Sequence, residues 1–375
     1  MITVKAVKTK KEQKEFLDFP LKLYKNNPYY VPPLYSDEKK IFRNDYVYLD
    51  QAEAVYFNAY DDTGKIVGRI SGILQRASNE KNNEKRVRFT RFDAVDDQRV
   101  ADALFDAVEK WAKSKGMDTV CGPLGFSDLE REGLLIEGFN YLATFEEQYN
   151  YDYYQRLIEN CGYAKEVDWV GFQLRAPKEQ NDRLERLSGL MMKKYNLHIG
   201  PAKNTKDFIK RYADGFFEII DSTYVDIYGT VPFTDGMKKM MIDNFKLIID
   251  VENVMVILDE NDRIVCFGIL FPSIAKAVQK SGGRLTVPTL FRLLKAIKQP
   301  KVFDLGLIGV LPEYARKGIS SLLIAKVIKS MREQNIEHAE TNLNLETNSN
   351  IINQWKSFDT TQHKRHRCFI KKIDG

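Results

Sequence analysis

The stretch GVLPEYARKGISSLLIAKVI, residues 309–328, restricts the fold of this chain more than any other segment. An apolar run ends in Leu-Pro, a short polar turn with one glycine follows, and an amphipathic pattern then begins. This order predicts a strand, a loop and the N-terminus of a helix. Because the first N–H groups of a helix have no partner within it, such a loop is suited to a phosphate. Alone, the loop does not distinguish a working anion site from one that has only kept its shape.

The length and charge of the chain limit its class. With 375 residues it exceeds what a single hydrophobic core usually organises, so we expect two domains. Its formal net charge of +5 suits an anionic ligand but is too small to indicate nucleic-acid binding. The N-terminal sequence has no apolar core of signal-peptide length, and no run reaches the roughly 18 apolar residues of a membrane span. These features predict a cytoplasmic protein without a transmembrane segment.

The cysteines and histidines form no metal-binding pattern. The four histidines make no HExxH or similar motif, and the cysteines show no CxxC spacing. We therefore expect no metal site and four free thiols. The cysteines are Cys121, Cys161, Cys266 and Cys368.

The predicted elements repeat in outline on either side of a charged, proline-containing linker, APKEQND, at residues 176–182. In each half, strands precede a long amphipathic helix and another strand follows it. We expect an α/β chain with domains at 1–176 and 177–375. Residues 276–299 form an insert in the second half, predicted to be largely helical after Pro288.

An internal alignment supports this division. Residues 318–340 align without gaps to residues 99–121, so that Leu323 meets Leu104. Helical periodicity alone generates part of the match, but repetition of the whole element order favours duplication.

The loop that follows Val310 also resembles a family signature. In the GNAT N-acyltransferase superfamily, the acetyl-CoA loop reads Arg/Gln-x-x-Gly-x-Gly/Ala. Gly318 stands at the central glycine, which lets the backbone approach a ligand closely. Ser320 replaces the last small residue, and an alanine stands where Arg or Gln is usual. Arg316 and Lys317 keep positive charge beside it.

A second motif lies downstream. In GNAT proteins the next strand leads to Asn-x-x-Ala-x-x-x-Tyr, and Asn348, Ile351 and Trp355 occupy those spacings here. In the family, this tyrosine often protonates the departing thiolate. Trp355 stands in its place, and an indole N–H is not a usable acid. The resemblance therefore implies cofactor binding but not the standard acid at this position.

The chain is similar over most of its length to a bacterial two-domain subgroup of GNAT-like proteins. The resemblance implies tandem GNAT-like folds, each a mixed central sheet flanked by helices. Some bacterial GNAT-like proteins acylate long-chain amino lipids, which keeps a lipid substrate open. The matching segments are GPLGFSDLEREGLLIEGF (122–139), YNYDYY (149–154), GY (162–163), LETN (345–348) and KRHRCFIKKI (364–373).

The resemblance implies one acyl-CoA per chain, acetyl or longer, bound by the second domain. In the first domain, Arg99 stands at the position of the loop glycine, and Asp96 and Asp97 would repel a pyrophosphate, so we expect no cofactor there. The expected cofactor-binding residues are Ile308, Val310, Arg316, Lys317, Gly318, Ile319, Ser320, Ser321 and Asn348.

Three acids are candidates for a general base that deprotonates an amine acceptor. Glu132 and Glu137 lie among glycines and leucines in the 122–139 block, where a buried carboxylate would have a raised pKa. The alternative is a loop capped by acids. Glu346 is expected on the strand beside the thioester, and its alternative is an ordinary surface acid.

Two further segments have a structural and a functional interpretation. The run YNYDYY is expected to pack in the core, but Tyr149 or Tyr153 is a possible replacement for the missing acid. The KRHR stretch, residues 364–367, is expected on a half-exposed edge strand, with some of its charge near the CoA phosphates.

These observations together predict an N-acyltransferase that moves an acyl group from acyl-CoA to an amine. The oxyanion is expected to be held by a backbone N–H near Val310, where the strand should splay from its neighbour. A non-catalytic acyl-CoA-binding protein and a partner-binding protein on a degenerate GNAT scaffold are the alternatives. The oligomeric state and the acceptor stay open.

Overall fold

A computed structural model describes residues 1–178, 182–225, 227–246, 248–315 and 317–373. The expected linker at 176–182 lies partly outside them. Contacts divide the chain into two compact units. The first unit contains residues 1–170, 275–290 and 363–375, and the second contains residues 171–274 and 291–362.

This division differs from a single boundary at 176/177. Residues 275–290 belong with the first unit, where the carbonyl of Gly283 accepts a hydrogen bond of 2.9 Å from the N–H of Tyr35. The end of the chain also returns to the first unit, because its last strand pairs there. Contacts between residues that are far apart in the sequence therefore determine which residues belong to each unit.

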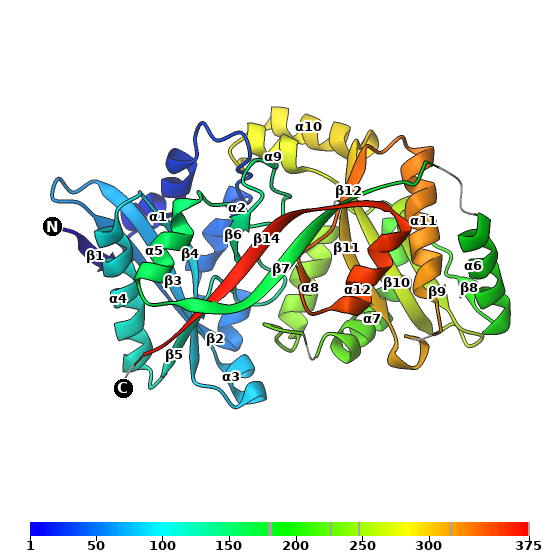
Figure 1. Cartoon of the computed structure of the whole chain (residues 1–375), viewed down its shortest axis with the longest axis horizontal. Helices are drawn as coiled ribbons and strands as arrows, with labels where there is room; N and C mark the ends of the chain where they lie inside the picture. The colour runs from blue at the N-terminus through cyan, green and yellow to red at the C-terminus, as the bar shows by residue number, and fades with distance from the viewer. Residues whose placement is uncertain (179–181, 226, 247, 316, 374–375) are drawn as a thin grey trace. The chain divides into compact units, whose positions relative to one another are not determined.

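The sheet of the first unit is mixed (Figure 1). Its first four strands are antiparallel neighbours, the fifth is parallel to the fourth, and the last strand of the chain is antiparallel to the fifth. In spatial order the strands are β1 (Thr3–Ala6), β2 (Ala52–Tyr60), β3 (Ile66–Gln75), β4 (Arg86–Ala94), β5 (Thr119–Gly122) and β14 (Asp359–Lys372), and β6 (Leu134–Glu137) also pairs with β14.

Helix α4 (Gln98–Ser114) connects the parallel strands β4 and β5. It packs closely on β3 because Gly68 and Gly72 have no side chain there: a Cβ at Gly68 would come within 2.8 Å of Val100, and one at Gly72 within 3.0 Å of Trp111. The remaining helices that belong wholly to this unit are α1 (Lys10–Leu23), α2 (Tyr35–Glu38), α3 (Arg76–Asn82), α5 (Tyr153–Asn160) and α9 (Ala275–Lys280).

The second unit also has a mixed sheet. Strands β11 and β12 are parallel, and the other paired neighbours are antiparallel. In spatial order the strands are β7 (Ala164–Arg175), β12 (His338–Glu340), β11 (Val302–Val310), β10 (Ile264–Pro272), β9 (Val254–Leu258) and β8 (His198–Ile199), and β13 (Asn344–Leu345) pairs with β7. Strand β7 begins in the first unit and ends in the second.

Helices cover both faces of this second sheet. On β10, the ring of Phe267 lies 4.3 Å from that of Phe216 on α7, whereas a Cβ at the next residue, Gly268, would meet Leu323 on α11. Since successive strand residues point to opposite faces, α7 and α11 lie on opposite sides. The helices are α6 (Asp182–Lys194), α7 (Thr205–Thr223), α8 (Asp235–Phe245), α10 (Val287–Lys298), α11 (Ser320–Glu333) and α12 (Ser349–Gln354), and the division between the units falls within α10.

The repeated element order expected from the sequence is present. In the first unit, β2, β3 and β4 precede α4 and β5, and in the second unit β9, β10 and β11 precede α11 and β12. Each series ends with a helical crossover to a parallel strand. The tandem α/β class is therefore observed, with a mixed sheet in each unit.

The expectation of a half-exposed edge strand at KRHR is wrong. Strand β14 pairs with β6 through Arg365–Arg367 and with β5 through Phe369–Lys372. His363, Lys364 and His366 are buried. The buried ammonium of Lys364 is stabilised by the carboxylate of Glu147, 2.6 Å away.

In the part of the chain that the structure describes, no helix combines the length and the apolar character needed to cross a bilayer. The same residues contain no group of three or more His, Cys, Asp or Glu side chains placed to hold a metal ion. The four cysteines are unpaired, and Cys121, Cys266 and Cys368 are buried.

Candidate functional site

The loop between β11 and α11 is open at its glycine. Gly318 has φ +72°, a left-handed conformation that favours glycine, and nothing lies within 4 Å of the position a Cβ would take. The loop is anchored at both ends, since the N–H of Leu311 donates to the carbonyl of Val265 at 2.9 Å and the side chain of Ile319 is buried. The backbone at Gly318 is therefore exposed between two fixed points.

Three consecutive amides at the start of α11 have no acceptor among the described residues. The N–H of Lys317 donates to the carbonyl of Tyr314 at 3.0 Å, and the N–H and hydroxyl of Ser321 both donate to the carbonyl of Gly318, at 3.1 and 2.6 Å. Within that part of the chain, these bonds leave the N–H groups of Gly318, Ile319 and Ser320 without a partner, and no side chain caps the helix. The partial positive charge of the helix N-terminus adds to these donors, so the loop is suited to an anion.

Positive charge lies beside these amides. The ammonium of Lys317 is 4.5 Å from the ring centroid of Tyr314 and 5.0 Å from that of Tyr195, so two tyrosine rings hold it by cation–π contact. Arg316 lies outside the described residues. The hydroxyl of Ser321 is used inside the first turn of α11, and Ile319 offers only its backbone.

Strand β11 extends beyond the end of its parallel neighbour, β12. Pairing with β12 runs from Val302 opposite His338 to Asp304 opposite Glu340, where β12 ends, while β11 continues to Val310. A bulge accompanies this separation, because residues 306 and 307 of β11 stand opposite a single residue of β10.

Val310 and Ile308 direct their backbone groups away from β10. Since the N–H of Leu311 bonds to Val265, the next pair, Val310 opposite Cys266, is a non-hydrogen-bonded pair of the antiparallel ladder. Ile308, two residues earlier and opposite Gly268, is also in a non-hydrogen-bonded pair. Its carbonyl accepts a hydrogen bond of 2.9 Å from the hydroxyl of Tyr224. The N–H of Val310 therefore points to the side where β12 has ended.

A cavity of about 40 Å³ lies in the second unit between α7, α8 and β10. Every side chain that lines it is apolar: Phe208, Ile209, Ala213, Phe216, Phe217, Met241, Ile242, Phe245, Ile249 and Ile269. The sequence analysis missed this cavity. Its only signal was the density of phenylalanine, methionine and isoleucine in two helices, a pattern that an ordinary core also produces.

Two pairs of aromatic rings in contact, one stacked and one tilted, connect the cavity wall to β11. Phe271 stacks on Phe245 with ring centroids 5.0 Å apart, and its ring fills the space of a Cβ at Gly306, 2.5 Å away. Phe267 likewise fills the space of a Cβ at Gly309, at 2.5 Å, and contacts a phenylalanine of the cavity wall. The glycines of β11 therefore bring the strand backbone within one ring layer of the cavity.

The three candidate bases differ in their unit, their burial and their contacts. In the first unit, burial raises the pKa of Glu132 well above its ordinary value, with a smaller contribution from the charge of Asp128, and its Oε2 has no hydrogen-bond partner among the described residues. Glu137 is exposed on β6 and pairs with Arg365 at 3.4 Å. In the second unit, Glu346 lies in an exposed turn after β13, not on the strand as expected.

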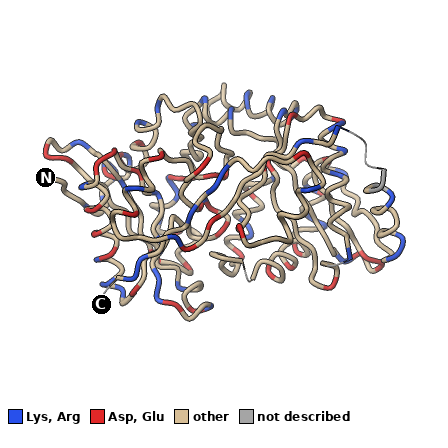
Figure 2. Tube along the Cα trace, viewed as in Figure 1, with Lys and Arg blue, Asp and Glu red and all other residues tan. Residues whose placement is uncertain are grey.

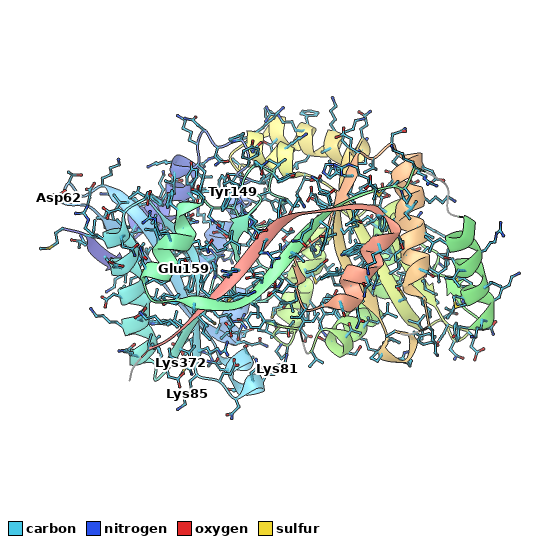
Figure 3. The ribbon with its side chains drawn as sticks, viewed as in Figure 1. Asp62, Lys81, Lys85, Tyr149, Glu159 and Lys372 are labelled. Atoms are coloured by element: carbon cyan, nitrogen blue, oxygen red, sulfur yellow. The ribbon has the colours of Figure 1, made fainter. Side chains whose placement is uncertain are left out.

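The hydroxyls of the two candidate tyrosine acids are hydrogen-bonded within the protein. Tyr149, labelled in Figure 3, donates to the carbonyl of Phe139 at 3.0 Å and accepts from Asn27 at 3.1 Å. Tyr153 donates to the carbonyl of Ala94 at 2.8 Å. Burial raises the pKa of both phenols. These contacts favour the packing interpretation of the YNYDYY run.

Residues 214–352, which include the β11–α11 loop and the beginning of α12, match the model of the acetyltransferase (GNAT) family. This part of the chain is therefore similar to the GNAT family. It is 28% identical over 382 residues to Protein YghO of Escherichia coli K12, covering 99% of this chain and 95% of the relative. It is 24% identical over 394 residues to the bacterial ceramide synthase of Caulobacter vibrioides, covering 99% and 98%.

Solved GNAT structures share the fold over the full length. A tandem GNAT protein from the clavulanic acid biosynthesis pathway superposes with a TM-score of 0.57 at 11% identity, covering 100% of this chain and 99% of that one. A GCN5-related N-acetyltransferase from Sphaerobacter thermophilus gives 0.51 at 10% identity, covering 100% and 96%. The tandem GNAT fold expected from the sequence is thereby confirmed.

The two residues of the downstream GNAT motif have structural contacts. Asn348 caps α12, its side-chain oxygen accepting from the N–H of Ile351 at 3.3 Å. Trp355 is buried, and its indole N–H donates to the side-chain oxygen of Asn344 at 2.8 Å. The structure therefore shows Trp355 as a packing residue whose indole N–H is already hydrogen-bonded.

The equivalent helix of the first GNAT-like unit begins differently. Asp97 caps α4. Its carboxylate accepts a hydrogen bond of 3.0 Å from the backbone N–H of Arg99 and forms an ion pair with the Arg99 guanidinium. The carboxylate of Asp97 therefore occupies the N-terminus of α4, whereas no side chain caps the N-terminus of α11 among the described residues.

Proposed function

We propose that this GNAT protein is an N-acyltransferase that transfers an acyl group from acyl-CoA to an amine. The observation that carries the proposal is the row of open amides at Gly318, Ile319 and Ser320, which follows a strand separated from its neighbour. In this proposal the amides and Lys317 bind the CoA pyrophosphate. Asp97 fills the corresponding place in the first unit, so one acyl-CoA binds per chain.

The proposed reaction is a direct displacement. The neutral amine nitrogen attacks the thioester carbonyl, a C–N bond forms, and the C–S bond then breaks to release CoA thiolate. The developing oxyanion accepts a hydrogen bond from the N–H of Val310, which the strand register leaves free of β10. The proton lost by the amine passes to a base, and a proton from water converts the thiolate to the thiol. Positioning supplies most of the rate, so no covalent enzyme intermediate is needed.

We propose an aliphatic acyl chain and a long-chain amine as the substrates. The Caulobacter relative is called a ceramide synthase, and a ceramide is a long-chain amine carrying an N-acyl chain. The apolar cavity behind β10 supports the same proposal, because aliphatic carbon is favoured where no lining group is polar. In this proposal the chain attached to the thioester enters the cavity past Phe267.

Glu132 is the proposed base among the three acids. Its raised pKa brings it nearer to neutral pH, where a general base is most effective, and its buried oxygen lacks a partner among the described residues. Glu137 is held by Arg365, and Glu346 stands in an exposed turn, so both are weaker candidates.

A non-catalytic acyl-CoA-binding protein is the second candidate. Trp355 favours it, because the position that often supplies the acid in GNAT enzymes has its only polar group bonded to Asn344. A partner-binding role on an inactive scaffold would need neither the open amides nor the cavity.

Calorimetry and thiol release distinguish these functions. Acetyl-CoA and palmitoyl-CoA are titrated into the full chain, and CoA thiol release is then followed with a panel of short and long-chain amines. We expect tighter binding of palmitoyl-CoA and amine-dependent release. Binding without release in any mixture would support the binding protein, and no binding of either thioester would remove both acyl-CoA functions.

A further inference from the structure

Helix α10 exposes apolar side chains at the spacing that normally marks a buried face. The residues at i, i+3, i+4 and i+7 are Val287, Leu290, Phe291 and Leu294, and their exposed fractions are 67, 49, 69 and 53%. With 3.6 residues per turn, these four positions form one stripe along the helix. About half or more of each of these side chains is therefore open to solvent.

The other side of the same helix is packed. Thr289 is fully buried, and Leu293, Ala296 and Ile297 are partly buried. The first turn is also fixed, since the hydroxyls of Thr286 and Thr289 lie 2.9 Å apart and the N–H of Leu290 donates to the carbonyl of Thr286 at 2.9 Å. The exposed stripe therefore lies opposite the buried and partly buried side chains of the same helix.

Exposed apolar residues are concentrated on this helix. Of the ten large hydrophobic residues that are exposed in the described chain, five lie between residues 285 and 294. Of the other five, two lie on α6, and the remaining three are Met1, Ile199 and Val225. Single exposed apolar residues need no explanation, but a contiguous patch indicates an interaction surface.

All charged residues in the segment that carries the stripe are basic. Residues 273–303 contain no aspartate or glutamate and seven lysines and arginines, and blue segments of the backbone tube recur along α10 in Figure 2. Among the described residues, only one of the seven has an acidic partner: Arg284 is 3.5 Å from Asp18. The seven are Lys276, Lys280, Arg284, Arg292, Lys295, Lys298 and Lys301.

We propose that α10 docks on the surface of a membrane that contains anionic phospholipid. The apolar stripe enters the boundary between headgroups and acyl chains, while Arg292, Lys295 and Lys298 bind phosphate groups beside it. A helix of 12 residues is about 18 Å long, well short of the roughly 30 Å core of a bilayer, so it lies in the interface and does not span.

The positive charge of the segment favours an anionic membrane over a second copy of the chain as the partner of α10. A second copy of the chain docked face to face would bring two sets of uncompensated cations together, which costs free energy. An anionic lipid surface offers both a negative potential and an apolar layer beneath it, and the helix carries the matching pair of features. The inference does not depend on the proposed acyl transfer.

Vesicle sedimentation tests the docking surface with the full chain. Vesicles of phosphatidylcholine alone are compared with vesicles of phosphatidylcholine and phosphatidylglycerol at a 7:3 ratio. We expect binding to the anionic vesicles, weakening as salt rises. The double variant Phe291→Asp with Leu294→Asp should lose at least about tenfold in partitioning. The double variant Arg292→Glu with Lys295→Glu should lose about fivefold for each basic residue removed.

Leu190→Asp is the matched control. Leu190 is 60% exposed on α6, outside the basic segment, and this substitution should leave vesicle binding unchanged. All variants alter exposed side chains, and thermal unfolding checks that they fold. Absence of binding to anionic vesicles, or equal binding of wild type and both α10 variants, would overturn the proposal. Sedimentation velocity supplies a third test, because a dimer that the Phe291→Asp, Leu294→Asp variant dissociates would assign the stripe to self-association.

Discussion

The indole N–H of Trp355, the residue that follows α12, donates to the side-chain oxygen of Asn344 on β13 at 2.8 Å. Trp355 is buried, and Thr360 donates its hydroxyl to the Trp355 carbonyl at 2.6 Å, so the tryptophan is bonded on both its side chain and its backbone. The contacts of Trp355 are therefore those of a structural residue.

Replacing Trp355 with phenylalanine should therefore destabilise the fold. Asn344 would lose its donor, and we expect the free energy of unfolding to fall by about 1–3 kcal/mol in urea. Trp111→Phe is the control, because within the described residues the Trp111 indole makes no hydrogen bond, although it contacts Lys115 by cation–π interaction. If thiol release is observed, its pH profile should not change in Trp355→Phe; a lost acidic limb would contradict the structural role.

Gly318→Ala tests the anion loop. The left-handed backbone costs an alanine about 1 kcal/mol, although the space is open. Gly116 at the end of α4 is a close match, with φ +71° and nothing within 4 Å of the place where a Cβ would stand, so Gly116→Ala should cost the same stability. We expect only Gly318→Ala to weaken CoA binding, by about tenfold in calorimetry. Equal CoA affinity of the two variants would remove Gly318 from the site.

Local patterns sufficed to predict the strand, loop and helix around Gly318, because periodicity and a single glycine determine them over 20 residues. The open amides followed from the same local rule. The position of Lys364 was not predictable in this way. Its partner Glu147 is 217 residues away, and only the pairing of β14 with two strands makes the site buried.

The same limit applies to Trp355 and Glu346. The sequence indicated that Trp355 is no acid, but its bond to Asn344 depends on the turn between β13 and α12. That turn begins one residue earlier than expected, which moves Glu346 off the strand. The stripe on α10 was also missed, because amphipathic spacing does not say which face of a helix the protein covers.

The buried pair of Lys364 and Glu147 should be strongly stabilising as a unit. Lys364→Met would leave the Glu147 carboxylate buried without its cation, and we expect a loss of about 3–5 kcal/mol in the free energy of unfolding. Adding Glu147→Gln removes the buried charge and should recover part of the loss. Arg43→Met breaks an exposed pair with Asp45 and should cost less than about 1 kcal/mol. Similar losses for the buried and exposed pairs would contradict the burial.

Glu132 should make the stability of the chain depend on pH. Burial raises its pKa in the folded state, so the folded chain holds this proton to higher pH than the unfolded chain. The free energy of unfolding therefore falls as the pH rises from the ordinary carboxyl range through the raised pKa, by up to about 1.4 kcal/mol per pH unit.

Glu132→Gln cannot ionise, so we expect its urea midpoint to vary less between pH 5 and 8 than that of the wild type and to exceed it at pH 8. Asp128, whose pKa burial also raises, contributes the remaining slope. Glu137→Gln is the control, because Glu137 is exposed. Parallel curves for Glu132→Gln and wild type would contradict an unpartnered buried carboxyl. A loss of thiol release in Glu132→Gln with wild-type stability at pH 6 would additionally support its role as the base.

The apolar cavity should select the acyl donor. Ala213 lines it from α7, and Ala213→Leu adds three carbons to a space of about 40 Å³. Because acetyl has no chain to place there, we expect acetyl-CoA affinity to stay within about twofold, whereas palmitoyl-CoA should bind at least about tenfold more weakly. Gly309→Ala should produce the same selectivity from the other side, since its Cβ would push the ring of Phe267 toward the cavity. Calorimetry with both thioesters measures the ratio. An equal loss for acetyl-CoA and palmitoyl-CoA would place the acyl chain elsewhere, while leaving CoA binding by the loop intact.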